Sequence, residues 1–238
     1  MHAAFGIVRL FPEGGLQRDC IRLARLLIGR GHQVMIFTSQ NLCDLQDLSV
    51  VLLPVRAYTN HGTDWAFARK FAAAVAGRFD RVVGFNKLID LDILYCADPP
   101  VEDRRRGWWY RALPRHRARL RLEGETFRPL SSTHIIALRR SLAERYQHHW
   151  GLGMDRFTIL PPAVDPARRR PDVRISHQHN ALRAALRLPA DRPIWIWIGA
   201  KPRIKGLDRV LETMVMKTDA VLLVVEKDAA EGGFGAML

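Results

Sequence analysis

Short apolar runs alternate with longer amphipathic stretches along most of the chain. The short runs are rich in β-branched residues, which predicts strands, and the longer stretches have helical spacing. We expect strands at 4–10, 33–38, 50–55, 81–85, 91–96, 134–138 and 157–160, and intervening helices such as 18–30 and 64–76. This alternation predicts a parallel, doubly wound α/β sheet, and such sheets bind ligands at the carboxyl ends of their strands.

The pattern changes near residue 161. Pro161-Pro162 opens a stretch rich in Pro, Arg, His and Asn that runs to about residue 180. We therefore predict a first domain over 1–160, a linker over 161–190 and the start of a second domain over 191–238. The second domain should contain a strand at 194–198, a helix at 207–216 and a strand at 220–225. Because two strands and a helix bury little core, we expect this domain to be truncated.

The turn between the first strand and the first helix carries a glycine pair, Gly14 and Gly15. Glycines at such a turn let backbone N–H groups approach an anion at the positive end of a helix. The G-x-G-x-x-G series is absent, and the second strand runs into Ser39-Gln40 rather than an acidic residue, so this is not the dinucleotide fingerprint. The turn is a candidate diphosphate cradle, and a purely structural tight turn is the alternative.

Composition narrows the class of protein. The 238 residues are 48% hydrophobic and 26% charged, as expected of a globular protein. No apolar run reaches about 20 residues and the first residues lack signal-peptide features, so we expect a cytoplasmic protein. Three scattered cysteines, Cys20, Cys43 and Cys96, suggest neither disulfides nor zinc. The net charge of +13 points to a polyanionic partner: nucleic acid, an anionic membrane or a phosphorylated substrate.

A basic, aromatic segment covers residues 104–121. Aromatic rings settle at the headgroup level of a bilayer while guanidinium groups pair with lipid phosphates, so the segment favours an anionic membrane surface. A solvated helix without a partner and a nucleic-acid patch are the alternatives. Pro114 predicts a break in the helix. The residues expected at the membrane are Arg104, Arg105, Arg106, Trp108, Trp109 and Arg111.

Several segments occur in the order seen in one enzyme family. The chain resembles family 4 glycosyltransferases of the GT-B fold, in particular those that add glucose to heptose in the lipopolysaccharide core. The resemblance implies a complete Rossmann-like N-terminal domain on the acceptor side and an incomplete Rossmann-like donor domain. The matching segments are FPEGGLQRD (11–19), GRGHQV (29–34), TNHG (59–62), DRVVGFNK (80–87), Asp98 after Cys96-Ala97, ILPPAV (159–164) and KGLDR (205–209).

The resemblance also implies roles for individual residues. Gly14 and Gly15 would hold the donor diphosphate together with Lys205 and Arg203, although the family has Arg where this chain has Ile204. Asp98 would lie beside the reacting sugar carbon, and helix capping is the alternative for it. The residues expected on the acceptor side are Asn60, His61, Asn86 and Lys87.

The implied reaction is transfer of a hexose, glucose by resemblance, from a UDP-sugar to inner-core heptose with retention. No metal or other cofactor is expected, and the implied partners are the UDP-sugar, the lipopolysaccharide acceptor and the inner leaflet of the inner membrane, without nucleic acid. The family's Glu-rich donor motif is missing, so the chain is expected to be either an active enzyme or an inactive truncated form. The alternative is a non-catalytic module that binds membrane or acceptor. A nucleotide-dependent oxidoreductase is disfavoured by the missing fingerprint.

Overall fold

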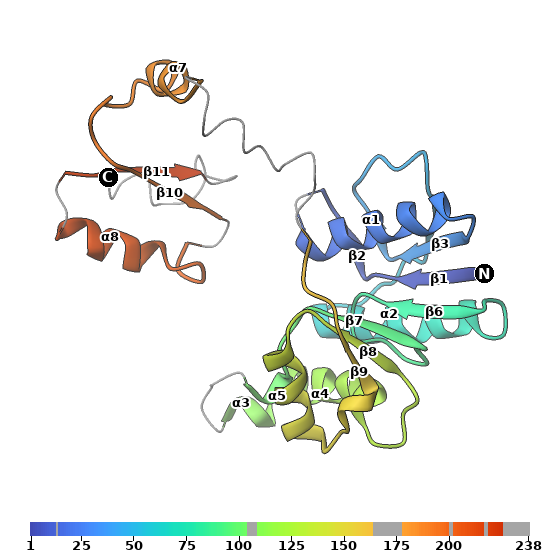
Figure 1. The fold of residues 1–238 in the computed structure, drawn as a ribbon. Helices are drawn as coiled ribbons and strands as arrows, with labels where there is room; N and C mark the ends of the chain where they lie inside the picture. Colours follow the sequence, from blue (N-terminus) through green and yellow to red (C-terminus); the bar gives the residue numbers. More distant parts are fainter. Residues whose placement is uncertain (13, 104–108, 164–177, 200–201, 217–218, 226–238) are drawn as a thin grey trace. The chain divides into compact units, whose positions relative to one another are not determined.

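The computed structural model describes residues 1–12, 14–103, 109–163, 178–199, 202–216 and 219–225. The chain divides into two compact units, Met1–Ala163 and Val164–Leu238 (Figure 1).

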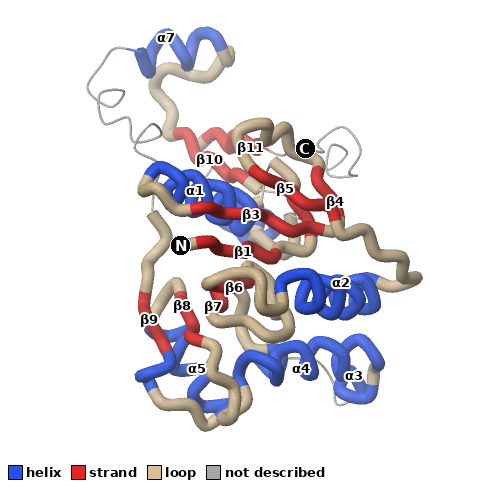
Figure 2. The backbone as a smooth tube through the Cα atoms, turned by 90° about the vertical axis from the view of Figure 1, so that its right-hand side faces the viewer, coloured by secondary structure: helices blue, strands red, loops and turns tan. Residues whose placement is uncertain are grey.

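The first unit is built on a seven-stranded parallel sheet with the strand order β5-β3-β1-β6-β7-β8-β9. The chain starts in the middle of the sheet, builds outward to β5, and returns to the other side of β1 with β6 (Figure 2). The strand order therefore reverses between β1 and β6, where ligands bind in open α/β sheets. The strands are β1 (His2–Gly6), β3 (Gln33–Thr38), β5 (Ser49–Leu52), β6 (Arg81–Gly84), β7 (Ile93–Cys96), β8 (His134–Ala137) and β9 (Phe157–Ile159).

Helices cover both faces of this sheet. Successive residues of β1 point to opposite faces, so Ala4 packs into one core while Ala3 and Phe5 pack into the other. The core that contains Phe5 is covered by α1 (Gly15–Gly29), and the core that contains Ala4 by α2 (Asn60–Val75), α4 (Pro114–Phe127) and α5 (Arg140–Trp150). The short helices are α3 (Trp109–Ala112), η1 (Val101–Asp103) and η2 (Met154–Arg156).

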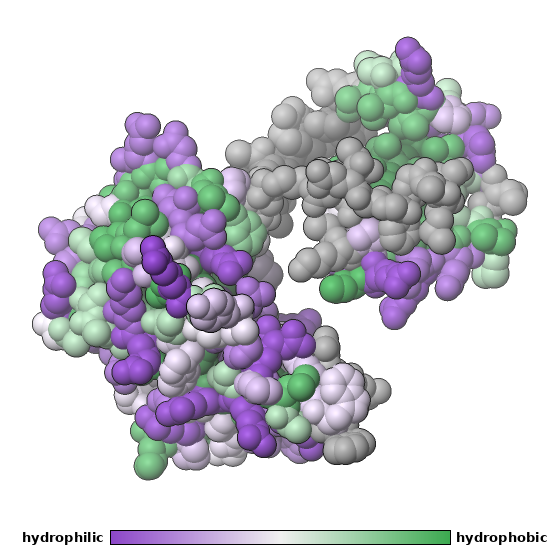
Figure 3. All heavy atoms as spheres, turned by 180° about the vertical axis from the view of Figure 1, so that it is seen from behind, coloured by the Kyte–Doolittle hydropathy of each residue, from purple (hydrophilic) through white to green (hydrophobic). Residues whose placement is uncertain are grey.

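The described residues of the second unit form two parallel strands, β10 (Ile194–Ile198) and β11 (Val221–Val225), and two helices, α7 (Gln178–Ala185) and α8 (Leu207–Val215). Apolar side chains stay exposed on β10, where Ile196 is 59% and Ile198 is 72% exposed. Figure 3 shows apolar, green side chains at the surface of this unit.

The structure confirms the predicted β-then-α order and the strand bounds at 33–38 and 194–198. The single strand expected over 4–10 is wrong. It divides into β1 and β2 (Arg9–Leu10), and β2 pairs with β4 (Gln40–Asn41). The chain leaves the main ladder at Val8, because the Val8 amide donates to the side chain of Asn86.

The break predicted at Pro114 is confirmed, since α3 ends at Ala112 and Pro114 takes the first position of α4.

Candidate active site

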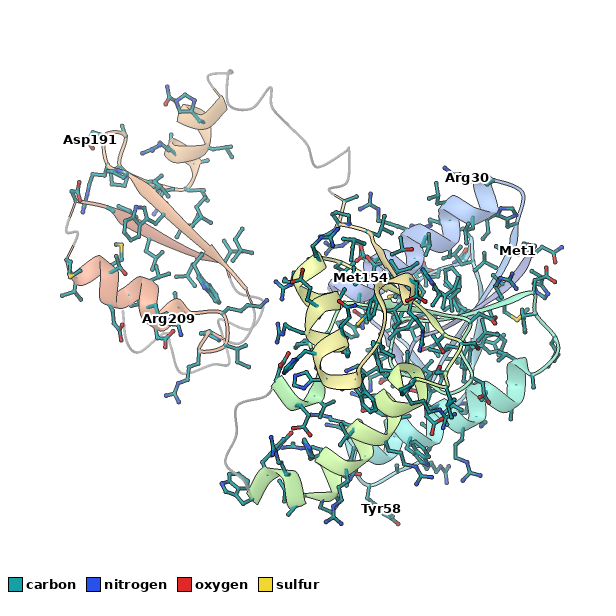
Figure 4. The ribbon with its side chains drawn as sticks, turned by 60° about the horizontal axis from the view of Figure 1, so that its bottom comes forward. Met1, Arg30, Tyr58, Met154, Asp191 and Arg209 are labelled. Carbon is teal, nitrogen blue, oxygen red and sulfur yellow. The ribbon has the colours of Figure 1, made fainter. Side chains whose placement is uncertain are left out.

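A cavity of about 170 Å³ lies at the carboxyl edge of the first sheet. The loops that line it follow β1, β6 and β7, and the helices α2 and α4 close its side. The cavity therefore lies at the reversal of strand order. Met1 and Arg30, labelled in Figure 4, mark the opposite, amino edge of the sheet, where the Gln33 amide donates to the Met1 carbonyl. The lining residues are Val8, Asp64, Asn86, Lys87, Asp98, Val101, Arg119 and Leu122.

Asn86 holds the loop after β1 in place. Its Oδ1 accepts a hydrogen bond of 2.8 Å from the backbone N–H of Val8. Because a backbone N–H can only donate, this contact fixes the orientation of the amide and leaves the NH₂ group to offer to the cavity. Asn86 thus contributes a donor to the site.

Lys87 is paired inside the protein. Its Nζ lies 2.5 Å from Oε2 of Glu123, whose side chain is 0% exposed. The same carboxylate accepts from the Val101 backbone N–H at 2.9 Å and from Trp150 Nε1 at 3.0 Å. Glu123 therefore ties α4 and α5 to the loops after β6 and β7. The positive charge of Lys87 is balanced locally, although Lys87 also lines the cavity.

Asp98 follows the end of β7 and is exposed. Its backbone carbonyl accepts a 3.0 Å hydrogen bond from the Tyr146 hydroxyl, which positions the loop. Within the described residues, the Asp98 carboxylate makes no hydrogen bond or ion pair. The structure thus provides no cap contact for this side chain, and its carboxylate is free to receive a hydroxyl group in the cavity.

Sequence reasoning missed Asp64 and counted Arg119 only as part of the basic segment. Asp64 lies on α2 and Arg119 on α4, and both line the cavity. Burial raises the pKa of Asp64, and the positive charges of Arg119, Arg9 and His61 partly oppose that shift. One feature of the sequence could have indicated Asp64. It follows Asn60 and His61 by about one helical turn, which places it on the same face of the helix.

Asn60 and His61 lie at the start of α2 and are absent from the cavity lining. Thr59 caps this helix, with its Oγ1 accepting from the Gly62 N–H at 3.1 Å. The side-chain Oδ1 of Asn60 accepts a long 3.5 Å hydrogen bond from the Arg9 guanidinium. Of the four residues expected on the acceptor side, Asn86 and Lys87 therefore share the cavity with Asp98.

The glycine turn leaves the N-terminus of α1 open. Gly14 is the N-cap, so the helix has no side-chain cap, and no acidic residue occupies its first turn. A Cβ at Gly14 would collide with the Gln17 side chain and lie 2.8 Å from the Phe11 ring, whereas the space around Gly15 is open to 4 Å. The first N–H groups of this 15-residue helix lack intrahelical acceptors and can bind an anion.

In the second unit, Arg203 and Lys205 are exposed in the turn between β10 and α8. The Lys205 carbonyl accepts a 3.3 Å hydrogen bond from Nε1 of Trp197, which is 7% exposed and packs inward. Gly206, with φ of 75°, then starts α8. The backbone of Lys205 is fixed while its side chain remains available.

The expected membrane segment is described only in part. Arg104, Arg105, Arg106 and Trp108 lie outside the described residues. Trp109 is 56% exposed, and Arg111 pairs with Glu102 at 3.2 Å.

Tyr110, the neighbour of Trp109, is 2% exposed and packs edge-on against His116.

Two features of the described residues bear on metal and membrane binding. No group of three or more His, Cys, Asp or Glu side chains there is placed to hold a metal ion. No helix in the same ranges is long and apolar enough to cross a bilayer.

Curated proteins with similar sequences are sugar transferases. The chain is 30% identical over 242 residues to the lipopolysaccharide glucosyltransferase WaaG of Escherichia coli K12, a match that covers 96% of this chain and 63% of that protein. It is also 31% identical over 106 residues to a D-inositol 3-phosphate glycosyltransferase of Xylanimonas cellulosilytica, a match that covers 44% of this chain and 25% of that protein. The chain thus spans less than two thirds of these relatives' lengths.

Structural comparison agrees. The crystal structure of WaaG, described as a glycosyltransferase involved in lipopolysaccharide biosynthesis, matches with a TM-score of 0.85 and 29% identity, covering 93% of this chain and 62% of that one. A glycosyltransferase from Rickettsia africae shares the fold, with a TM-score of 0.54 and 12% identity over 95% of this chain and 69% of that one. The family model described as Glycosyltransferase Family 4 matches residues 13–168. The chain belongs to glycosyltransferase family 4.

Proposed function

We propose that this protein transfers a hexose, glucose by similarity, from a UDP-sugar to a heptose of the lipopolysaccharide inner core, with retention. The observation that carries the proposal is the cavity at the reversal of strand order, which brings Asp98 together with Asn86 and Lys87. The similarity to the E. coli lipopolysaccharide glucosyltransferase over 96% of the chain supports the substrate class.

Asp98 is proposed as the catalytic residue. In the transfer, a bond forms between the acceptor oxygen and the sugar C1, the bond from C1 to the diphosphate oxygen breaks, and the proton of the acceptor hydroxyl passes to the departing diphosphate. A carboxylate beside the acceptor orients that hydroxyl and stabilises positive charge that develops on the sugar ring. The Asp98 carboxylate suits this role because it has no partner in the described part of the chain.

The donor diphosphate is proposed to bind backbone N–H groups and cations. In the first unit, the uncapped N-terminus of α1 at Gly14 and Gly15 offers N–H groups to a phosphate. In the second unit, the exposed Arg203 and Lys205 carry charges that can pair with a phosphate. This donor set uses positive charge where other transferases use a divalent cation, so no metal is expected.

We also propose that the basic segment places the protein on the anionic inner leaflet of the inner membrane, where a lipid-linked acceptor is found. The exposed Trp109 and Arg111 support this part of the proposal. The protein is then cytoplasmic and peripheral, and nucleic acid is not a partner.

The test is transfer of radiolabelled glucose from UDP-glucose to a deacylated core oligosaccharide that ends in heptose. We expect product with the unmodified protein and at least ~10-fold less with Asp98→Asn, equivalent to about 1.4 kcal/mol of transition-state stabilisation. Equal rates for both proteins would remove Asp98 from catalysis. Oligosaccharide binding without product would favour the alternative, a non-catalytic acceptor-binding module.

A further inference from the structure

Carboxylates outnumber cations among the charged side chains that line the cavity, once the cation already paired with a buried carboxylate is left out. Asp64, Lys87, Asp98 and Arg119 line it. Lys87 is neutralised by the buried carboxylate of Glu123 at 2.5 Å. Among the described residues that line the cavity, two carboxylates therefore face one guanidinium.

The hydrogen-bonding groups of the cavity suit a sugar ring. The carboxylates of Asp64 and Asp98 accept hydrogen bonds, while the Arg119 guanidinium and the Asn86 NH₂ group donate them. Adjacent sugar hydroxyls can satisfy both kinds of group, because each hydroxyl donates once and accepts. Apolar lining residues are available to the C–H faces of a ring, namely Val8, Val101 and Leu122.

An anionic group is less well suited to this cavity. A phosphate or carboxylate that reached Arg119 would also lie near the carboxylates of Asp64 and Asp98. Like charges brought this close repel each other. Of the described residues that line the cavity, Arg119 offers an opposing charge that is not already paired, and Arg9 and His61 act on Asp64 without lining the cavity.

Asp64 and Arg119 are positioned by a contact between the two helices that carry them, α2 and α4. Arg121, two residues beyond Arg119 on α4, places its guanidinium 4.6 Å from the ring centre of Trp65, the residue next to Asp64 on α2. This cation–π contact joins α2 to α4 beside the cavity. The two polar side chains thus come from a fixed pair of helices.

We propose that Asp64 and Arg119 determine which acceptor the protein takes, and that the cavity accepts a neutral sugar ring with adjacent hydroxyls rather than a phosphorylated one. The inference rests on the proposed function and names the acceptor class of the same site.

Calorimetric titration with two soluble probes tests the inference. The probes are the methyl glycoside of a heptose disaccharide and the same disaccharide carrying one phosphate. We expect the protein to bind the neutral probe at least ~10-fold more tightly, equivalent to about 1.4 kcal/mol. Asp64→Asn and Arg119→Gln should each weaken binding of the neutral probe by roughly fivefold or more, and UDP binding should not change.

A matched control separates recognition from bulk charge. Arg117→Gln removes the same charge from the same helix, but Arg117 lines a separate groove that includes Trp150. This variant should bind the neutral probe within about twofold of the unmodified protein. Moreover, Asp64→Asn and Arg119→Gln change the net charge in opposite directions, so a general charge effect would move their affinities in opposite directions.

Three results would overturn the inference. They are equal or tighter binding of the phosphorylated probe, equal losses in Arg117→Gln and Arg119→Gln, and UDP binding without binding of either disaccharide. Failure of the proposed function itself looks different, because the unmodified protein would then bind neither UDP nor disaccharide and transfer no glucose.

Discussion

Asp64 occupies a position that costs the folded state free energy. Burial raises its pKa despite the nearby positive charges of Arg119, Arg9 and His61. The folded protein then holds the proton to a higher pH than the unfolded chain, so Asp64 lowers stability as the pH rises through its folded pKa. A polar group kept at such a cost is typical of a functional site.

We therefore expect Asp64→Asn to raise Tm modestly at pH 7–8 while it weakens acceptor binding. The gain in Tm should shrink as the pH falls toward the ordinary aspartate pKa of about 3.9. Thermal unfolding from pH 4 to pH 8 measures this, with the exposed Asp44→Asn as a control that should not shift Tm. A lower Tm for Asp64→Asn at neutral pH would show that the neighbouring positive charges outweigh burial.

At the scale of single residues, the sequence predicted part of the site. Asn86, Lys87 and Asp98 were expected from the family resemblance, and they share the cavity because they follow strands whose carboxyl ends meet at one edge. Asp64 and Arg119 were not assigned to the site, because their position depends on how α2 packs against α4. Nothing in the local sequence encodes the Trp65–Arg121 contact that joins these helices.

Helix α4 contributes residues both to the basic segment and to the cavity, which the sequence treated as separate sites. Its exposed arginines, such as Arg115 and Arg117, belong to the basic segment. The same helix carries Arg119 into the cavity and Glu123 into the buried ion pair with Lys87. Because Glu123 also accepts from Val101 and Trp150, it anchors α4 to the loop that carries Asp98.

Glu123→Gln should therefore destabilise the fold strongly. The change leaves Lys87 without its countercharge, and breaking a buried ion pair costs about 3–5 kcal/mol. Glu125→Gln on the same helix is the control, since Glu125 pairs with Arg128 at 3.3 Å near the surface and should cost no more than about 1 kcal/mol. Urea unfolding measures both, and comparable losses in the two variants would refute the anchoring role of Glu123.

Some strands and helices are easier to recognise from the sequence than others, for physical reasons. The central strands are buried on both faces, which gives short apolar runs that are easy to recognise. The break between β1 and β2 was missed because it depends on Asn86, which lies 78 residues from Val8 in the sequence. Helix α5 is harder to recognise in the sequence because most of its residues are polar and its apolar face is narrow, with Leu142, Ala143 and Tyr146 buried.

At the scale of the whole molecule, the net charge of +13 attracts the protein to any anionic surface. Membrane binding through the basic segment further requires that this attraction be concentrated on α3 and α4. Three exposed arginines at the amino edge of the sheet, Arg30, Arg78 and Arg81, offer a comparison with equal charge.

Replacing Arg111, Arg115 and Arg117 together by Gln should weaken binding to anionic vesicles by roughly 100-fold at low salt, since each arginine near a surface contributes about 1 kcal/mol. The triple change at Arg30, Arg78 and Arg81 should have a much smaller effect. Binding should also fall with salt, because the Debye length is about 8 Å at physiological ionic strength and 3 Å at 1 M. Vesicle co-sedimentation measures this, and equal losses in both triple variants would show that only net charge matters.

The central claim is that an acceptor sugar binds at the carboxyl edge of the first sheet, against Asp98. A titration of the ¹⁵N-labelled protein with deacylated core oligosaccharide ending in heptose tests it most directly, with amide chemical shifts as the readout. The account predicts saturable shifts at Val8, Asn86 and Asp98, and unchanged signals at the amino edge around Met1 and Arg30. Shifts confined to the amino edge, or no shifts at saturating oligosaccharide, would contradict it.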